Sequence, residues 1–462
     1  MDYDSIESVF NPRSIALVGV TTNAEHWTRT FLSGLLEFGF EGSLYLVNPK
    51  GGEIDGFKLY HSIKDVPESV DYVIGLVPAR VAPGLVREAA SKGAKAIQFG
   101  TAGFAETGSE HGRNLQNDLI KAARETGIRV IGPNCMGIYS PGSGLSFCDD
   151  FPKEKGLVGF ISQSGGNTFE LVREAGRRGV RFSKVVSYGN ASDLNESDFL
   201  EYMATDSETK IIAVYIEGVE DGTRFREALG KAASEKPVVL LKGGITEAGT
   251  RAASGHTGAL AGSEAIWEAL CKQLEVMRVY SLQELADMLV TLSFMSRPAG
   301  RRVGLVGLGG GASVLITDDF ERRGLKVPSL PEEVRGKLRE FSSDAGNIFR
   351  NPVDYSQAME VNKAIKTFET ISQWDEIDFL IGFTKLSQTP KTLLFDRLRK
   401  GMLEASKVVQ KPMAFVIEPE LSPEKAKDSL SLIQEFTDAG LPVYYSFASA
   451  ANAISLRLGH AG

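Results

Sequence analysis

Short apolar runs alternate with amphipathic, helix-length stretches along the whole chain. The apolar runs are rich in Val, Ile and Leu, as are strands that are buried on both faces. The stretches between them place apolar residues three or four positions apart, which is the spacing of a helix with one buried face. Strands that alternate with such helices are typical of βαβ units. The pattern therefore predicts an α/β protein built on parallel sheets.

The pattern falls into three consecutive sets of elements. The first set has strands at Ser14–Val18, Ser43–Val47, Tyr72–Val77, Ala96–Phe99 and Val130–Ile131, and helices at Thr30–Phe38, Val81–Lys92 and Leu115–Thr126. The second has strands at Leu157–Ile161, Lys184–Val186, Ile211–Ile216 and Pro237–Leu241, and helices at Asn167–Arg178, Ser197–Thr205, Gly222–Ser234, Ser263–Leu274 and Leu282–Met295. The third has strands at Arg302–Val306, Phe379–Phe383, Met413–Ile417 and Val443–Tyr445. We predict three doubly wound domains: a Rossmann-type domain over residues 1–142, a flavodoxin-like domain over 143–297 and a third over 298–462.

Composition narrows the class of protein. A chain of 462 residues fits three domains, at roughly 100–200 residues each. The net charge of −8 gives no reason to expect a nucleic-acid partner. The three cysteines have neither metal-ligand spacing nor a disulfide pattern, so we expect a reducing compartment and no metal site. No signal peptide and no apolar run of roughly 18–20 residues is present, so we expect a cytoplasmic protein without a membrane partner.

His256 lies in a run of small residues, SGHTGALAGS, at positions 254–263. Small neighbours let large groups approach the imidazole, whose neutral form is a nucleophile. A histidine built into a core would have bulky apolar neighbours instead. His256 is therefore a candidate catalytic residue, and the alternative is a loop histidine without a role.

Two Gly-rich turns join a predicted strand to a predicted helix. Ser164, Gly165 and Gly166 form the first turn, and Gly309, Gly310 and Gly311 form the second. The free N–H groups and the positive dipole end of a helix N-terminus can hold a phosphate. The alternatives are ordinary N-capping for the first turn and a close helix–sheet contact for the second.

Several turns follow strands of the first predicted sheet and should share its carboxyl edge, where ligands bind in open α/β sheets. They carry Gly19, Val20, Thr21, Lys50, Val77, Pro78, Asn134 and Cys135. The first turn lacks the G-x-G-x-x-G spacing, which argues against an NAD-dependent dehydrogenase. A binding crevice is therefore expected at this edge, although a lone turn or lysine can also be merely structural or solvated.

Glu217 follows the apolar strand Ile211–Ile216. A carboxylate there could orient a histidine and favour its charged or phosphorylated form, although a single strand-end Glu is more often structural. Together with His256 and the two phosphate-binding turns, it suggests phosphoryl transfer through a phosphohistidine. The chain has no P-loop and no kinase signature.

The motifs SGHTGALAGS, ISQSGG, YIEG, GPNCMG and NPVD resemble those of the NDP-forming acyl-CoA synthetase superfamily, which includes succinyl-CoA synthetase. Their order along the chain is also that of the family. The resemblance implies a CoA-binding Rossmann domain, a flavodoxin-like domain with the active-site histidine and a flavodoxin-like ligase-CoA domain. It also implies a reversible reaction in which acyl-CoA and phosphate give an acyl phosphate, whose phosphoryl group passes to the histidine. A swinging loop then carries it to ADP on an ATP-grasp domain.

The resemblance assigns a role to each candidate residue. His256 would be phosphorylated, Glu217 would steady it, and the two Gly-rich turns would hold the phosphoryl group from opposite sides. Lys50, Val77 and Pro78 would contact the nucleotide part of CoA, together with the first turn, Gly19 to Thr21. Asn134 and Cys135 would lie near the thiol end of CoA.

Two departures from the family pattern affect these expectations. The first turn reads GVTTNAEHWTRTF instead of a small Gly/Ser-rich run, so the mode of CoA binding could differ. No ATP-grasp segment follows the third domain, so we expect a separate ATP-grasp β-type subunit, carrying ADP or ATP with Mg, in a hetero-oligomer. The substrate would be an acyl-CoA or its carboxylic acid. The alternative is a non-catalytic CoA-binding or acyl-CoA-binding protein, which would have no need of the His256 and Glu217 pair.

Overall fold

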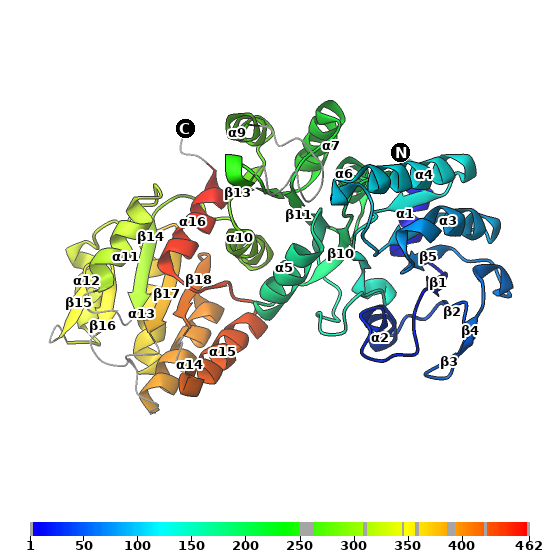
Figure 1. Ribbon diagram of the computed structural model, residues 1–462. Coiled ribbons are helices and arrows are strands. Elements are labelled where there is room, and N and C mark those ends of the chain that lie inside the picture. Colours follow the sequence, from blue (N-terminus) through cyan, green and yellow to red (C-terminus); the bar gives the residue numbers. More distant parts are fainter. Residues whose placement is uncertain are drawn as a thin grey trace. The chain divides into compact units, whose positions relative to one another are not determined.

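The computed structural model describes residues 3–249, 263–307, 312–343, 346–355, 360–385, 393–419 and 423–459. Its strands form three largely parallel sheets with helices packed on them (Figure 1), which confirms the predicted α/β class. The chain divides into two compact units, one formed by Met1–Gly176 and Arg181–Leu285, the other by Arg177–Val180 and Ala286–Gly462. The first unit contains the first two sheets and the second contains the third. The boundaries of the three predicted domains stay predictions.

The first sheet has the order β3-β4-β2-β1-β5-β6-β7, and only the edge pair β3–β4 is antiparallel. Its parallel strands follow the order of a dinucleotide-binding doubly wound fold. The strands are β1 Ser14–Val18, β2 Ser43–Val47, β3 Gly52–Ile54, β4 Phe57–Tyr60, β5 Tyr72–Gly75, β6 Ala96–Phe99 and β7 Arg129–Ile131. The helices are α1 Tyr3–Phe10, α2 Arg29–Glu37, α3 Ala82–Ser91 and α4 Glu110–Thr126, with the short η1 Ile63–Asp65, η2 Ala79–Val81, η3 Ala105–Thr107 and η4 Pro141–Ser143.

Alternate residues of the central strands are buried on opposite faces of this sheet. Val73 and Ile97 belong to one core with α3 and α4, which lie side by side (Figure 1). Tyr72 and Ile74 instead line a small cavity with Phe31 of α2. Both faces are therefore covered, which explains why these strands read as continuous apolar runs.

The second sheet has the order β13-β12-β11-β9-β10-β8, in which only β8 is antiparallel to its neighbour. Its five parallel strands have a flavodoxin-like order, in agreement with the predicted flavodoxin-like fold. The strands are β8 Gly137–Tyr139, β9 Val158–Ser162, β10 Phe182–Ser187, β11 Ile211–Ile216, β12 Val238–Lys242 and β13 Met277–Val279. The described helices are α5 Gly165–Arg177, α6 Glu196–Thr205, α7 Gly222–Glu235, α9 Glu264–Gln273 and α10 Leu282–Phe294.

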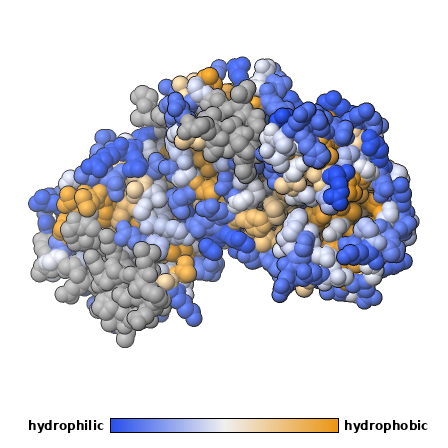
Figure 2. Space-filling view, viewed as in Figure 1, coloured by the Kyte–Doolittle hydropathy of each residue, from blue (hydrophilic) through white to orange (hydrophobic). Residues whose placement is uncertain are grey.

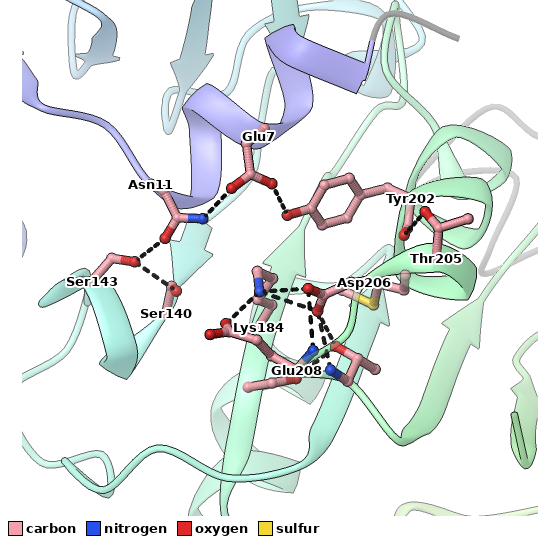
Figure 3. Close-up of polar contacts among 12 residues, drawn as sticks. Glu7, Asn11, Ser140, Ser143, Lys184, Tyr202, Thr205, Asp206 and Glu208 are labelled. Atoms are coloured by element: carbon pink, nitrogen blue, oxygen red, sulfur yellow. Dashed lines mark hydrogen bonds and ion pairs between the residues drawn. The ribbon is translucent and has the colours of Figure 1, made fainter.

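The first two sheets are joined by polar and aromatic contacts within the first unit. Glu7 of α1 accepts a hydrogen bond of 2.6 Å from the hydroxyl of Tyr202 on α6 (Figure 3). The rings of Phe10 and Tyr202 stack at 5.2 Å between centroids. Arg129 of β7 pairs with Asp193 at 3.0 Å. The N-terminal helix therefore packs on the second sheet's helix layer, although it precedes the first sheet in the chain.

The third sheet has the order β15-β16-β14-β17-β18-β19, and only the edge pair β15–β16 is antiparallel. Its strands are β14 Val303–Gly307, β15 Asn347–Phe349, β16 Val353–Tyr355, β17 Phe379–Lys385, β18 Met413–Glu418 and β19 Val443–Tyr444. Its helices are α11 Ala312–Glu321, α12 Glu332–Arg339, α13 Val361–Ser372, α14 Leu393–Val408, α15 Pro423–Asp438 and α16 Phe447–Leu458. Setting aside β15, the strands repeat the flavodoxin-like order of the second sheet.

Candidate functional site

The first sheet changes winding direction between β1 and β5, which is where open α/β sheets form ligand crevices. Gly19 follows β1 with φ of 97°, and a Cβ there would overlap the carbonyl of Leu76. The N–H of Gly19 donates to Val47 O at 2.8 Å, and that of Leu76 donates to Val18 O at 2.8 Å. Glycine is required at this position because the ends of two neighbouring strands pack directly against the turn.

The rest of the first turn is tied to the end of β2. The carbonyl of buried Val20 accepts a hydrogen bond of 2.8 Å from the side chain of Asn48. The same Asn48 side chain accepts from the N–H of Lys50 at 3.0 Å. Thr21 is partly buried and Lys50 is exposed. The predicted residues Gly19, Val20, Thr21 and Lys50 therefore do lie at one edge of the sheet.

Val77 and Pro78 follow β5 at the same edge, partly buried and exposed respectively. The bulky part of the first turn precedes α2. Trp27 there is 45% exposed, and its ring packs edge-on against the ring of Phe31, with 6.0 Å between the ring centroids. The aromatic residue that departs from the family pattern is thus anchored to α2, and nearly half of it stays open to solvent.

The turn after β7 connects this edge to the second sheet. Asn134 has φ of 58°, and Met136 N–H donates to the hydroxyl of Ser187 on β10 at 3.2 Å. Cys135 is buried, and its thiol donates to Phe99 O at 3.4 Å. Burial raises the pKa of the Cys135 thiol to about 12. Cys135 is therefore a neutral thiol at physiological pH, not a thiolate nucleophile.

The turn between β9 and α5 carries the predicted phosphate-binding residues. Helix α5 begins at Gly165, and the hydroxyl of Ser164 accepts from Asn167 N–H at 3.3 Å. Ser162 accepts from the N–H of Ser164 at 3.3 Å and so fixes the turn from the strand side. The first N–H groups of a helix have no acceptor within it, so those of Gly165 and Gly166 are available to an anion.

A cavity of about 300 Å³ joins these two turns within the first unit. It is lined by Gly100, Asn134, Cys135, Met136, Gln163, Ser164, Gly165, Gly166, Gly189 and Asn190. The structure therefore brings the residues predicted for the CoA thiol end together with those predicted for phosphate. The sequence assigned no role to the other five members, although Met136 belongs to the GPNCMG motif and Gln163 to the ISQSGG motif.

Glu217 follows β11, beside the point where the second sheet changes winding direction between β9 and β11. It is 8% exposed and accepts a hydrogen bond of 3.1 Å from the hydroxyl of Tyr215. Its backbone N–H donates to the Gln163 carboxamide oxygen at 2.7 Å. The same strand edge thus holds the predicted orienting carboxylate and the predicted phosphate turn.

Lys242 at the end of β12 holds the turn after β11 from the other side. Its ammonium donates to Glu217 O at 2.7 Å and also to Gly243 O. It lies 5.5 Å from the centroid of the Trp267 ring. Burial lowers the pKa of Lys242 to about 8, against the opposing effect of the Glu217 charge. Sequence reasoning missed Lys242 because a strand-end lysine carries no motif.

A second missed group braces the turn that carries Asn134. Asn190 donates to the Glu106 carboxylate at 2.6 Å and to Gln116 at 3.0 Å, and it accepts from Asn134 at 3.4 Å. Burial acts to raise the pKa of Glu106, but hydrogen bonds from Asn190 and from backbone N–H groups outweigh it and lower that pKa. This network fixes Asn134 at the cavity wall.

Some predicted site residues lie outside the described residues: His256, Gly309, Gly310 and Gly311. In the described part of the third domain, the hydroxyl of Ser313 on α11 donates to Asp354 at 2.6 Å. Asp354 is the last residue of the NPVD motif and is buried. This motif residue therefore has a helix-bracing role in the fold.

Within the described residues, Cys148, Asp149 and Asp150 could together reach a metal ion. The Cys148 thiol donates to Asp150 at 2.8 Å, and Arg173 pairs with Asp150 at 2.9 Å. Burial raises the pKa of the Cys148 thiol to about 11. A protonated thiol and an arginine-paired carboxylate are poor ligands, so the cluster does not favour a metal.

In the described part of the chain, no helix has the length and apolarity needed to cross a bilayer. The face shown in Figure 2 is largely hydrophilic, with small hydrophobic patches between.

Comparisons with protein families match the first two sheets separately. A CoA-binding domain model matches residues 13–141. A model described as the succinyl-CoA ligase-like flavodoxin domain matches residues 155–292.

Individual relatives extend the match over the chain. It is 35% identical over 445 residues to the α subunit of ADP-forming acetate–CoA ligase II from Pyrococcus furiosus, covering 95% of this chain and 94% of that protein. It is 30% identical over 411 residues to the ADP-forming 4-hydroxybutyrate–CoA ligase of Nitrosopumilus maritimus, covering 88% of this chain and 58% of that longer protein. The structure of an acetyl-CoA synthetase from Candidatus Korarchaeum cryptofilum, in complex with phosphate and ADP, aligns with a TM-score of 0.84 at 29% identity. That alignment covers 98% of this chain and 96% of the other.

Proposed function

The chain belongs to the family of NDP-forming acyl-CoA synthetases, in which it is of the α-subunit type, and we propose that it carries the phosphate-dependent part of their reaction. In this part, acyl-CoA and phosphate give CoA and an acyl phosphate, whose phosphoryl group passes to His256. ADP then takes the phosphoryl group. The overall reaction converts acyl-CoA, phosphate and ADP to the carboxylic acid, CoA and ATP, and it is reversible.

One observation carries this proposal: a single cavity is lined by Asn134 and Cys135 on one side and by Ser164, Gly165 and Gly166 on the other. Its volume of about 300 Å³ is at the lower end of the range for small-molecule sites. Such a volume suits a thioester and a phosphate, with the nucleotide part of CoA outside the cavity. The two reactants of the first step would thus meet where the two turns meet.

In the first step, a phosphate oxygen attacks the thioester carbonyl. A carbon–oxygen bond forms, the carbon–sulfur bond breaks, and CoA leaves as a thiolate that takes up a proton. The N-terminus of α5 supports this step because its dipole and free N–H groups stabilise the anionic phosphate. The neutral, buried thiol of Cys135 does not compete as a nucleophile.

In the second step, a nitrogen of His256 attacks the phosphorus of the acyl phosphate, and the carboxylate leaves. We assign to Glu217 the stabilisation of the imidazolium that this creates. The buried position of Glu217, with Tyr215 donating to it, suits a carboxylate held in one orientation. Gly309, Gly310 and Gly311 are proposed to hold the phosphoryl group as well.

The edge of the first sheet is proposed to bind the nucleotide part of CoA. Gly19, Val20 and Thr21 offer a turn with backbone groups, and the exposed ammonium of Lys50 offers a charge for a phosphate. Val77 and Pro78 offer apolar surface at the same edge.

The transfer to ADP is proposed to need a separate ATP-grasp β-type subunit that binds ADP with Mg. The proposal is supported by the relative that is named as an α subunit and that this chain spans almost completely. We further propose that the two chains form a hetero-oligomer in the cytoplasm.

The test is to incubate the purified chain with acetyl-CoA, or with other acyl-CoAs, and radioactive phosphate. We expect release of CoA and an acid-labile phosphate on His256, located by mass spectrometry. The variant His256→Asn is expected to lose the label completely and to keep its melting temperature, since its neighbours in sequence are small.

Two other results would change the conclusion. A panel of acyl-CoAs that leaves the protein unlabelled, while CoA still binds, would favour a non-catalytic CoA-binding protein. A His256→Asn variant that does not fold would make this histidine a structural residue.

A further inference from the structure

The side chain of Gln163 lines the cavity. In the chain, Gln163 lies between Ser162, which ends β9, and Ser164, which caps α5. It is 5% exposed. Its oxygen Oε1 accepts from the backbone N–H of Glu217 at 2.7 Å and of Gly218 at 3.2 Å. Because only the oxygen of a carboxamide can accept from N–H groups, these bonds fix which end of the side chain faces the turn after β11.

The amino group Nε2 must then face the other way. None of the described residues provides a hydrogen-bond acceptor for Nε2. Nε2 is also not among the side-chain atoms that are buried without a partner, so it is accessible. It therefore opens onto the cavity that Gln163 lines, next to the first turn of α5. A nearly buried side chain thus presents two N–H donors beside the free N–H groups of Gly165 and Gly166.

The cavity wall also lacks positive side chains. None of the described residues that line it is lysine or arginine. A phosphate held there would be bound by neutral donors and by the helix dipole. Neutral donors stabilise the anion without forming an ion pair with the oxygen that has to attack the thioester.

Resting on the proposed function, we propose that Gln163 is a further catalytic residue of the phosphate site, whose Nε2 donates a hydrogen bond to an oxygen of the bound phosphate and then of the acyl phosphate. The two ends of the Gln163 carboxamide have different roles. Oε1 holds the backbone of Glu217, and Nε2 binds the reacting anion. The phosphate and the orienting carboxylate are therefore positioned by one side chain.

The variant Gln163→Glu separates these two tasks. A glutamate keeps an acceptor for the N–H groups of Glu217 and Gly218, but it has no donor and repels phosphate. Gln163→Leu removes both ends without adding charge. Gln434→Glu on α15 adds the same charge at an exposed position and serves as the control.

In the first measurement, the binding of inorganic phosphate to the whole chain is monitored by the broadening of the ³¹P resonance. We expect Gln163→Glu to weaken phosphate binding about 10²-fold, because a hydrogen bond to a charged group is lost and a like charge is added, with an unchanged melting temperature. CoA binding should stay as in the wild type. The wild type and Gln434→Glu should bind phosphate equally.

The second measurement is the dependence of CoA release from acetyl-CoA on phosphate concentration. Gln163→Glu should raise the KM for phosphate, here the phosphate concentration that gives the half-maximal rate of CoA release in the first turnover. The deficit should shrink at acid pH, where a protonated glutamate regains a donor. A purely structural role would leave the phosphate KM of Gln163→Glu within about twofold of the wild type, because its acceptor is kept. That result, or a wild type that binds no phosphate, overturns the proposal.

The outcomes also separate this proposal from the proposed function. If the wild type binds phosphate through Gln163 but releases no CoA, the binding role holds and the enzymatic function fails. If Gln163→Glu does not fold, Gln163→Leu decides: weaker phosphate binding supports the donor, and unchanged binding refutes it.

Discussion

Burial sets the protonation of the ionisable residues around the cavity. It raises the pKa of Cys135 to about 12 and lowers that of Lys242 to about 8. The same effect reaches Glu196, the first residue of α6, which is 3% exposed. A helix N-terminus favours a carboxylate, but here burial outweighs that effect and raises the pKa of Glu196 to about 7.

The raised pKa of Glu196 predicts a specific dependence of stability on pH. Between about pH 4.5 and 7 the folded state holds a proton on Glu196 that the unfolded state has lost. The free energy of unfolding should therefore fall as the pH rises through this window. Asp198 and Glu220 nearby act in the same direction, and Arg224 opposes them.

The variant Glu196→Gln removes this titration, so the stability of the wild type relative to it should decrease from pH 4.5 to 7. Urea unfolding of both proteins at a series of pH values measures the difference. Glu227→Gln, which removes the same charge from an exposed position on α7, should show no comparable trend. A difference that stays constant across the window would contradict the assignment.

At the scale of elements, β10 is a strand of the second sheet whose residues are all buried, yet it carries a lysine. Lys184 reaches Asp206 at 3.0 Å and Glu208 at 2.7 Å, in the loop after α6 (Figure 3). Asp206 also accepts from the hydroxyl of Thr209 at 2.6 Å. The strand and the loop are thus joined by a hydrogen-bonded ion pair that replaces the water lost on burial.

Replacing Lys184 by methionine should cost about 3–5 kcal/mol of unfolding free energy, because it leaves a buried carboxylate without its cation. Lys155 offers a matched control, since it pairs with the same Glu208 from an exposed position. Lys155→Met should cost no more than about 1 kcal/mol. Denaturant titrations of both variants test this, and equal losses would refute the distinction between the buried and the exposed pair.

At the scale of the whole molecule, the cavity and Glu217 belong to one compact unit. Their relative placement is fixed by contacts between the first two sheets, such as Arg129 with Asp193. The chemistry proposed for acyl-CoA and phosphate therefore uses residues of one unit up to the formation of the acyl phosphate.

This arrangement predicts how the reaction divides between chains. With acetyl-CoA, phosphate and ADP, the purified chain should release CoA up to about one equivalent and form no ATP. Adding an ATP-grasp β-type chain from an ADP-forming acetate–CoA ligase should give continuous ATP formation, measured with luciferase. Sustained ATP formation by this chain alone would show that no partner is needed.

The sequence by itself determined the local elements and the turns that carry candidate chemistry. The strand Ser14–Val18 and the turn at Gly19 follow from apolar runs and from the conformational needs of single residues, which are properties of neighbours in the chain. The predicted strands differ from the observed ones by only a residue or two at their ends. The strands that were missed, β3, β4, β8, β13, β15 and β16, have only three or four residues each, which is too few to show a period.

Only the tertiary structure decided which turns meet. It pairs β8 with β10 and brings Asn134 against Asn190, and it closes Gln163 onto Glu217. Strand order, burial and the accessibility of Nε2 depend on contacts between residues far apart in the chain, and hydrophobic periodicity does not encode which partner a strand selects. The sequence therefore named the candidate phosphate turn, and the fold showed that the side chain of Gln163 lies beside it at the same cavity.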